Sequence, residues 1–213
     1  MKRGVLIAFE GIEGSGKTTQ AEMAYEFLKG EGINTVFTRE PGGTPCGEKI
    51  REILLNPLFK GMHPKTELLL YLASRSEHVA KKIRRALFVE KAVVISDRYE
   101  LSSLAYQGAG RGLTLKVVSR LNKFATGGLS PDLTILVDVD VETAFSRLGE
   151  KKDRMEQEEK KFHALVRVTY LSLARRAPKR IKVFNGCKDK KELHEEIKSE
   201  IVKFLKKRGI YEE

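Results

Sequence analysis

The sequence predicts an α/β fold of three layers, in which helices cover both faces of a five-stranded parallel sheet. Short apolar runs that do not alternate with polar residues recur along the chain, as expected for strands buried on both faces. Longer stretches of helical character separate these runs, and strands that alternate with helices pair in parallel. The expected strands are residues 5–10, 35–38, 92–96, 133–138 and 181–184.

In the first half of the chain, glycine and proline mark the ends of the elements. Gly30 and Gly32 close the helix that follows the first strand. The second strand runs into Arg-Glu-Pro-Gly-Gly at 39–43, which is a turn by composition. Pro64 suits the first turn of a long helix. The helices expected here are residues 17–29, 47–55 and 65–90.

In the second half, glycine-rich residues 108–112 predict a loop, and the polar residues 149–152 link two helices. The last helix places Leu193, Ile197 and Ile201 on one apolar face. We expect one domain, 1–213, in which residues 147–160 form a small mobile lid. The helices expected here are residues 101–106, 115–125, 141–148, 153–176 and 190–207.

The composition leaves two interpretations of the net charge. Lys and Arg number 40 against 29 Asp and Glu, so the net charge is +11. This excess suits a polyanionic partner, or it reflects a well-solvated surface rich in lysine. The second interpretation is favoured for most of it, because the basic clusters lie in helix-like stretches of mixed charge. We therefore expect no nucleic-acid partner.

Other features of the composition predict a cytoplasmic protein. Cys46 and Cys187 lack a metal or redox spacing, which indicates reduced thiols, and the four histidines show no ligand spacing. The apolar run at residues 5–9 is too short for a signal peptide or a membrane span. We expect a soluble protein without a membrane partner.

One motif indicates a phosphate-binding loop. Residues 11–18 read GIEGSGKT, which matches G-x-x-x-x-G-K-[ST] between a buried strand and a helix. The glycines let backbone N–H groups turn inward toward phosphate oxygens, and the helix adds its positive end. A P-loop NTPase-type fold follows. The residues expected to bind ATP are Gly11, Ile12, Glu13, Gly14, Ser15, Gly16, Lys17, Thr18 and Thr19.

The end of the third strand favours a kinase over a GTPase. Asp97 comes directly after residues 92–96, where an acid reaches a Mg²⁺ ion beside the P-loop, and Thr18 supplies a second ligand. Arg98 follows, as an anionic acceptor requires. The alternative for Asp97 and Arg98 is a surface ion pair. The guanine signature Asn-Lys-x-Asp is absent from the sequence, since residues 122–125 read NKFA.

The chain resembles the thymidylate kinases nearly from end to end. Several segments beyond the P-loop carry the resemblance, and three of them together are far more specific than that loop: REPGGT, DRY-x-x-S-S-x-A-Y-Q and DR-x-E-Q-E. The segments are FEGIEGSGKTTQ (9–20), TREPGGTPCGEKIRE (38–52), LLYLASRSEH (69–78), SDRYELSSLAYQGAGRG (96–112), PDLTILVDVD (131–140) and DRMEQE (153–158).

The resemblance implies a binding site for dTMP. Tyr71 would stack on thymine, Arg75 would contact the base edge, and Arg98 would hold the acceptor phosphate. The spacing of Tyr71 and Arg75 also places a ring and a guanidinium on one helix face, although a core tyrosine and a surface arginine would share that spacing. The residues implied are Glu40, Arg51, Tyr71, Arg75, Arg98, Ser103, Tyr106 and Gln107.

The resemblance also implies how the transfer is catalysed. Glu13 stands where some members carry an arginine, so this chain resembles the branch whose lid supplies the cations. Arg147 and Arg154 are the arginines expected in that role, with Lys151 and Lys152 as further candidates. The residues expected to act in catalysis are Lys17, Asp97, Arg98, Arg147 and Arg154.

These features together predict a Mg²⁺-dependent, in-line transfer of the γ-phosphate of ATP to dTMP, giving dTDP and ADP for dTTP biosynthesis. The resemblance further implies a homodimer with the helix at residues 65–90 in its interface. Two alternatives stay open at this point. One is a kinase for UMP, dUMP or a nucleoside. The other is an ATPase or regulator that uses no acceptor.

Overall fold

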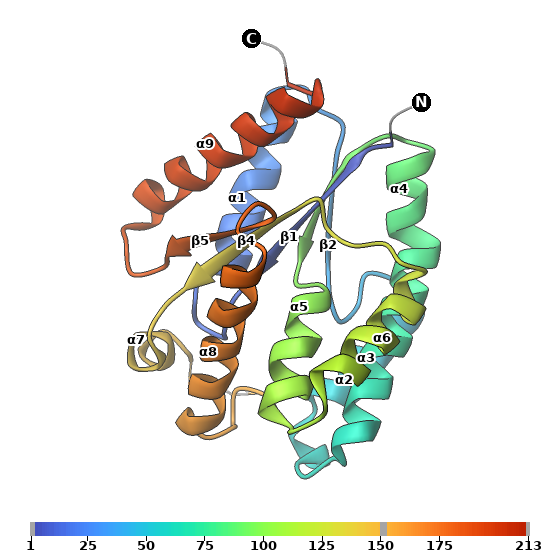
Figure 1. Ribbon diagram of the computed structural model, residues 1–213, viewed down its shortest axis with the longest axis vertical. Coiled ribbons are helices and arrows are strands. Elements are labelled where there is room, and N and C mark those ends of the chain that lie inside the picture. Colours follow the sequence, from blue (N-terminus) through green and yellow to red (C-terminus); the bar gives the residue numbers. More distant parts are fainter. Residues whose placement is uncertain (1–2, 150–152, 212–213) are drawn as a thin grey trace.

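The computed structural model describes residues 3–149 and 153–211. The strands of this part form one all-parallel sheet in the order β2-β3-β1-β4-β5 (Figure 1). The predicted α/β class and the five-stranded parallel sheet are therefore confirmed. The strands are β1 (Val5–Glu10), β2 (Thr35–Arg39), β3 (Val93–Asp97), β4 (Leu133–Asp138) and β5 (Ile181–Asn185).

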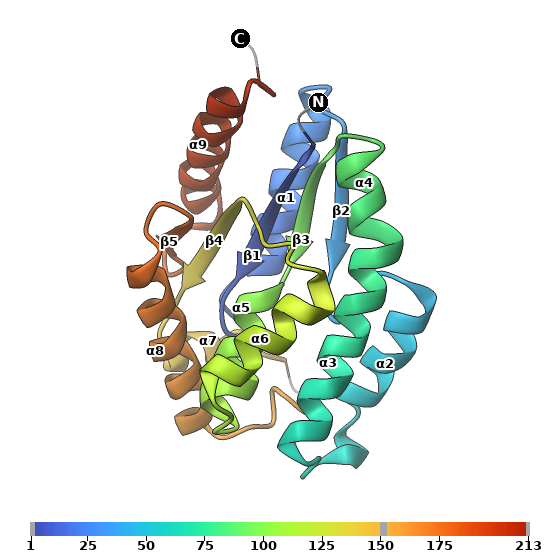
Figure 2. The same cartoon turned by 45° about the vertical axis from the view of Figure 1, so that its right-hand side comes forward.

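One face of the sheet is covered by α1 (Lys17–Gly30) and α9 (Lys190–Arg208), which lie side by side in both views (Figures 1 and 2). The apolar residues of α9 recur every four positions, so Ile197 and Ile201 both face inward and are fully buried. They pack with alternate residues of β1 and with Leu28 of α1. This is the first layer on the sheet.

The other face is covered by a series of helices, two of which, α3 and α5, continue into π-helical segments. Residues of β1 that point to this face, Leu6 and Ala8, pack against this layer. The elements are α3 (Pro64–His78), a π-helical turn (Val79–Ile83), α4 (Arg84–Phe88), α5 (Glu100–Ser103), a π-helical segment (Leu104–Gly110), α6 (Leu115–Thr126) and α8 (Lys160–Arg176).

The prediction of a loop from residue 108 was wrong, because helical structure extends to Gly110. The two glycines serve close packing here. A Cβ atom at Gly108 would lie 2.6 Å from a methyl group of Leu115, and one at Gly110 would lie 2.6 Å from the ring of Phe162. Their composition resembled that of a loop, but their lack of side chains lets α6 and α8 pack closely against this helical segment.

The prediction of a helix from residue 153 was also wrong, since α8 begins at Lys160. Residues 154–157 form a turn instead. Asp153 Oδ1 accepts hydrogen bonds from the N–H groups of Met155 (2.8 Å) and Glu156 (2.9 Å), as a helix cap does. However, the Arg154 N–H donates to Leu55 O at 3.0 Å, so the turn is joined to another helix.

Connections that carry polar side chains gather beyond the carboxyl ends of the strands. Near these ends lie α2 (Pro45–Leu55), a short 3₁₀ turn (Pro57–Phe59) and α7 (Val141–Ser146), whereas β1 begins and α9 ends at the opposite edge (Figure 1). Ligands of open parallel sheets bind at this edge. No helix within residues 3–149 and 153–211 is long and apolar enough to span a membrane.

Candidate functional site

The loop between β1 and α1 curls as the motif predicted. Gly14 has φ of 73°, and a Cβ atom there would lie 2.1 Å from the carbonyl oxygen of Ala144. Gly16, with φ of 89°, occupies the N-cap of α1 without a side-chain cap. Both positions require glycine. The first N–H groups of α1 are thereby left open to an anion.

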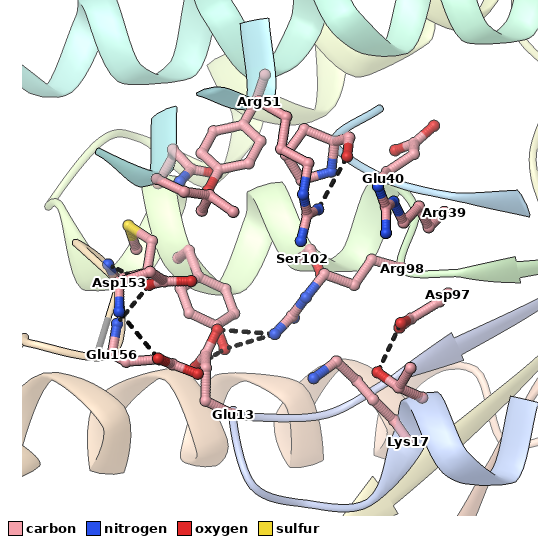
Figure 3. A pocket seen from close by; sticks show the side chains of 17 residues that line it. Glu13, Lys17, Arg39, Glu40, Arg51, Asp97, Arg98, Ser102, Asp153 and Glu156 are labelled. Carbon is pink, nitrogen blue, oxygen red and sulfur yellow. Dashed lines mark hydrogen bonds and ion pairs between the residues drawn. The ribbon is translucent and has the colours of Figure 1, made fainter. Parts of the chain in front are cut away.

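Lys17 extends from the start of α1 into the interior of the site (Figure 3). Lys17 is only 7% exposed, and its Nζ lies 3.4 Å from Ile12 O. Burial and the positive charge of Arg98 lower the pKa of the Lys17 ammonium. An anion bound here would remove part of that unfavourable electrostatic energy.

Thr18 and Asp97 meet at the carboxyl end of β3. The Thr18 hydroxyl donates to Asp97 Oδ2 at 2.6 Å (Figure 3). The other carboxylate oxygen, Oδ1, is buried and has no hydrogen-bond partner among the described residues. A hydroxyl and an unsatisfied carboxylate oxygen side by side suit a hard cation that keeps most of its water. No group of three or more ligating side chains occurs among the residues that the structure describes.

Arg98 adopts a backbone conformation that side chains rarely take, with φ of 72°. Its N–H donates to Phe9 O at 2.8 Å, and its carbonyl accepts from Ser96 Oγ at 2.7 Å. The next N–H, of Tyr99, donates to the buried Glu10 carboxylate at 2.9 Å. These three bonds hold a left-handed turn that costs about 1–3 kcal/mol, and such strain is typical of functional positions.

The Arg98 side chain bridges the P-loop and the helical layer. Nη2 donates to Glu13 Oε1 at 2.7 Å, and Nη1 donates to Gly11 O and to Ser102 Oγ, each at 3.1 Å. The guanidinium also lies over the ring of Tyr106, 5.2 Å from its centre, and the Tyr106 hydroxyl donates to Glu13. A cation is thus fixed directly above the loop that is expected to hold phosphate.

Glu13 and Arg98 each shift the pKa of the other toward the charged form. Burial alone would raise the pKa of the Glu13 carboxyl, but the charge of Arg98 holds it well below its usual value. Burial would likewise lower the pKa of Arg98, whereas Tyr106 and Glu13 raise it. Both groups are therefore charged at neutral pH.

A cavity of about 230 Å³ connects these groups to the far side of the site (Figure 3). Lys17, Thr18 and Asp97 line one end, and Arg98 lies between this end and the other. Asp153 and Glu156 lie at the far end, across the site from Asp97 (Figure 3).

Six of the eight residues expected to bind the acceptor line this cavity. Arg51 reaches it from α2, and its Nη1 donates to Pro41 O at 2.9 Å. Tyr71 comes from α3, and Gln107 from the π-helical segment that follows α5. The six are Glu40, Arg51, Tyr71, Arg98, Tyr106 and Gln107.

The other two, Arg75 and Ser103, lie behind the cavity wall. Arg75 is 2% exposed and donates to Glu40 (2.6 Å), Ser103 (2.8 Å) and Tyr99 O (2.9 Å). It also donates to Asn122 Oδ1. These four bonds leave one of its five N–H donors for another acceptor.

The P-loop residues and the expected lid cations are differently placed. Of the nine residues expected to bind ATP, only Glu13, Lys17 and Thr18 line the cavity. Arg147 is exposed, and its Nη1 donates to Gly186 O at 2.9 Å, outside the cavity. Arg154 is buried, and its Nη1 donates to Glu67 at 2.6 Å. Lys151 and Lys152 lie outside the described residues.

Sequence reasoning missed seven residues that line the cavity. Most belong to segments that carried the family resemblance, so these segments could have indicated them, although no role was assigned to the individual residues. Leu55 had no such signal, because it reads as the last apolar residue of a helix. The seven are Arg39, Pro41, Leu55, Ser102, Asp153, Met155 and Glu156.

Comparisons with known proteins agree with the geometry. The family model described as thymidylate kinase matches residues 9–197. The thymidylate kinase of Kosmotoga olearia is 47% identical over 207 residues, covering 96% of this chain and 99% of that protein. That of Carboxydothermus hydrogenoformans is 49% identical over 200 residues, covering 92% and 96%. The crystal structure of thymidylate kinase from Ehrlichia chaffeensis superposes with a TM-score of 0.75 at 34% identity, covering 93% and 98%.

The lowered pKa of Glu13 predicts a pH-dependent stability effect. Ionised Glu13 stabilises the fold fully above the pKa of an unfolded glutamate, about 4.5, and this contribution is lost as the pH falls through the lower folded-state value. Glu13→Gln should therefore differ most from the wild type in unfolding free energy at pH 7, and the difference should shrink below pH about 4.5. Urea titrations at pH 7 and at a series of pH values below 4.5 measure it. A difference independent of pH would contradict the charge assignment.

Proposed function

The chain belongs to the thymidylate kinase family, which phosphorylates dTMP with ATP, and we propose that it carries out this transfer in the cavity that joins Lys17 to Tyr71. One observation carries the assignment of the site. A single cavity is lined by Lys17 of the P-loop at one end, by Arg98 in its middle, and by the aromatic ring of Tyr71 and the amide of Gln107 (Figure 3). This set of groups is the one that donor phosphates, an acceptor phosphate and an acceptor base would need.

The proposed chemistry is electrostatic. The P-loop N–H groups and Lys17 would hold the β- and γ-phosphates of ATP. The acceptor phosphate, largely a dianion at neutral pH because its second pKa is about 6, needs no general base. Arg98 would hold this phosphate against the repulsion of the donor. The fixed cations then align the two phosphates and neutralise the charge between them.

We propose Mg²⁺ as the metal. The Thr18 hydroxyl and the unsatisfied Asp97 Oδ1 fit an ion that takes few protein ligands and completes its shell with water and phosphate oxygens. When bound, it would supply further charge neutralisation at the β- and γ-phosphates. Thr18 and Asp97 would hold it from the P-loop side of Arg98.

The acceptor base would lie between Tyr71 and Gln107, which line the cavity, while Arg75 lies behind the cavity wall. A phenol ring supplies a stacking face, and an amide matches the carbonyl edge of thymine. Tyr106, which lines the cavity and whose hydroxyl donates to Glu13, would border the sugar.

Residues 147–160 are proposed as a lid within one domain of residues 1–213. The phosphate transfer to dTMP would serve dTTP biosynthesis.

A homodimer is also proposed. The outward faces of α3 and α6 carry exposed apolar side chains, including Leu69, Val117 and Phe124. The two helices pack against each other through Leu68, Leu72 and Val118, so these faces adjoin. Exposed apolar area of this kind marks an interaction surface. We therefore propose that α3, the first part of the long helix expected at residues 65–90, belongs to the interface.

A coupled assay of ATP consumption tests the acceptor assignment. With Mg²⁺ present, dTMP should support the highest kcat/KM among dTMP, dUMP, UMP, dGMP and AMP, and omission of the acceptor should abolish turnover. A preference for another monophosphate would refute the proposed acceptor while retaining the P-loop chemistry. Turnover without any acceptor would favour an ATPase.

Removing the Arg98 guanidinium should impair the transfer itself. Arg98→Ala should lower kcat with dTMP by about 10²–10³-fold, the usual cost of losing one preorganised group that stabilises developing charge. Steady-state kinetics measure it. The control is Arg85→Ala, because Arg85 forms an exposed ion pair with Glu90 away from the cavity and its loss should leave kcat unchanged. A normal kcat in Arg98→Ala would refute its role.

A charge in the proposed interface should dissociate the dimer. Phe124 is 87% exposed in the single chain, and Phe124→Asp should weaken self-association by about tenfold or more. Size-exclusion chromatography with light scattering over a range of protein concentrations measures it. Val168→Asp is the control, since Val168 is an exposed apolar residue of α8. A wild-type protein that is monomeric at all concentrations would refute the dimer.

A further inference from the structure

A buried carboxylate outside the cavity, that of Glu67, joins three separate parts of the acceptor site. Glu67 lies on α3 one helical turn before Tyr71 and has no exposed surface. Its carboxylate accepts from Arg154 Nη1 at 2.6 Å, from Gln107 Nε2 at 2.9 Å and from Arg111 Nη2 at 3.0 Å. The donors come from the 154–157 turn and from the end of the helical layer.

Each segment that meets at Glu67 also lines the acceptor end of the cavity. Tyr71 belongs to α3, and Gln107 itself borders the cavity while it donates to Glu67. Arg154 stands between Asp153 and Met155, both of which border the cavity. One carboxylate therefore fixes the ring, the amide and the turn relative to one another.

Opposite charges hold this junction together. Arg154 is 3% exposed, and its Nε donates to Leu54 O at 2.6 Å. Its one carboxylate partner among the described residues is Glu67. Burial would raise the pKa of the Glu67 carboxyl, but the hydrogen bonds from Arg111 and Gln107 lower it. Removing the negative charge would leave a buried guanidinium unpaired, which is strongly unfavourable. The turn would then be released from α3.

The helices themselves do not depend on this junction. Leu68 and Leu72, on either side of Glu67 along α3, pack with Val118 in an apolar cluster. Backbone hydrogen bonds hold the π-helical segment, and Ala105 and Tyr106 of that segment pack in the core shared with α8. Loss of the Glu67 charge should therefore change the shape of the cavity wall more than it changes the fold.

We propose that Glu67 is a positioning residue that sets the affinity for the acceptor nucleotide by holding Gln107 and the 154–157 turn against α3. The inference rests on the proposed role of this cavity as the acceptor site. Among the described residues, the Glu67 carboxylate has Gln107, Arg111 and Arg154 as its hydrogen-bond and ion-pair partners, and none of them belongs to the P-loop, so its effect should be confined to the acceptor. The donor nucleotide should be bound normally without it.

The test compares the two substrates in one variant. Glu67→Gln keeps the size of the side chain but removes the charge and replaces one of the two acceptor oxygens by an N–H₂ group, which would face a donor. It should raise KM for dTMP by about tenfold or more and leave KM for ATP within about twofold. Titration calorimetry with dTMP in the absence of ATP should show the same loss of affinity. A purely structural role would lower the active fraction without separating the two KM values.

A matched control uses another carboxylate that binds the same arginine. Glu158 accepts from Arg111 Nη2 at 2.6 Å, but it is partly exposed and does not line the cavity. Glu158→Gln should leave both KM values within about twofold of the wild type. If Glu67→Gln does not fold, Glu67→Asp keeps the charge but shortens the reach to its three donors, and the same selective rise in KM for dTMP is expected.

The outcomes separate the two claims. If the wild type does not phosphorylate dTMP, the proposed function fails. If the wild type does so, and a folded Glu67 variant has unchanged KM and affinity for dTMP, the positioning role is overturned. It is also overturned if KM for ATP rises as much as KM for dTMP.

Discussion

The ion pair between Arg98 and Glu13 is the interaction on which the site depends. A transfer between two phosphates needs positive charge in the narrow space between them, and that charge must be buried before the substrates arrive. Glu13 makes this possible, because its carboxylate lies 2.7 Å from the guanidinium and compensates it inside the protein. The tyrosine hydroxyl that donates to Glu13 fixes the carboxylate in turn. The cation is therefore held in place without a ligand.

The parallel sheet supplies the geometry for this pair. Glu13 follows β1 and Arg98 follows β3, and these strands are direct neighbours in register from Val5 and Val93 onward. Their carboxyl ends therefore deliver the P-loop and the arginine to one place. The helical layer adds Tyr71 and Gln107 from beyond the sheet edge. Donor chemistry thus depends on strand order, whereas acceptor recognition depends on how the helices and the 154–157 turn pack.

The contrast between a donor side set by strand order and an acceptor side set by helix packing also determined what the sequence could predict. The strands were recognisable because they are apolar on both faces, and Gly14, Lys17 and Thr18 were recognisable because phosphate binding restricts residue types at fixed spacing. The burial of Arg154 was not predictable, since its partner Glu67 is 87 residues away and charged residues in a polar segment read as a solvated surface. Gly108 and Gly110 misled the prediction because close packing and loops both select glycine.

The left-handed backbone at Arg98 has a consequence for how this protein can change over evolutionary time. Glycine is the residue that adopts this conformation without strain, so the backbone itself would favour Gly at position 98. Only the side chain justifies arginine there. A change to glycine would therefore relieve the backbone strain but remove the guanidinium, so stability at this position cannot be improved in that way without loss of the charge between the two phosphate sites.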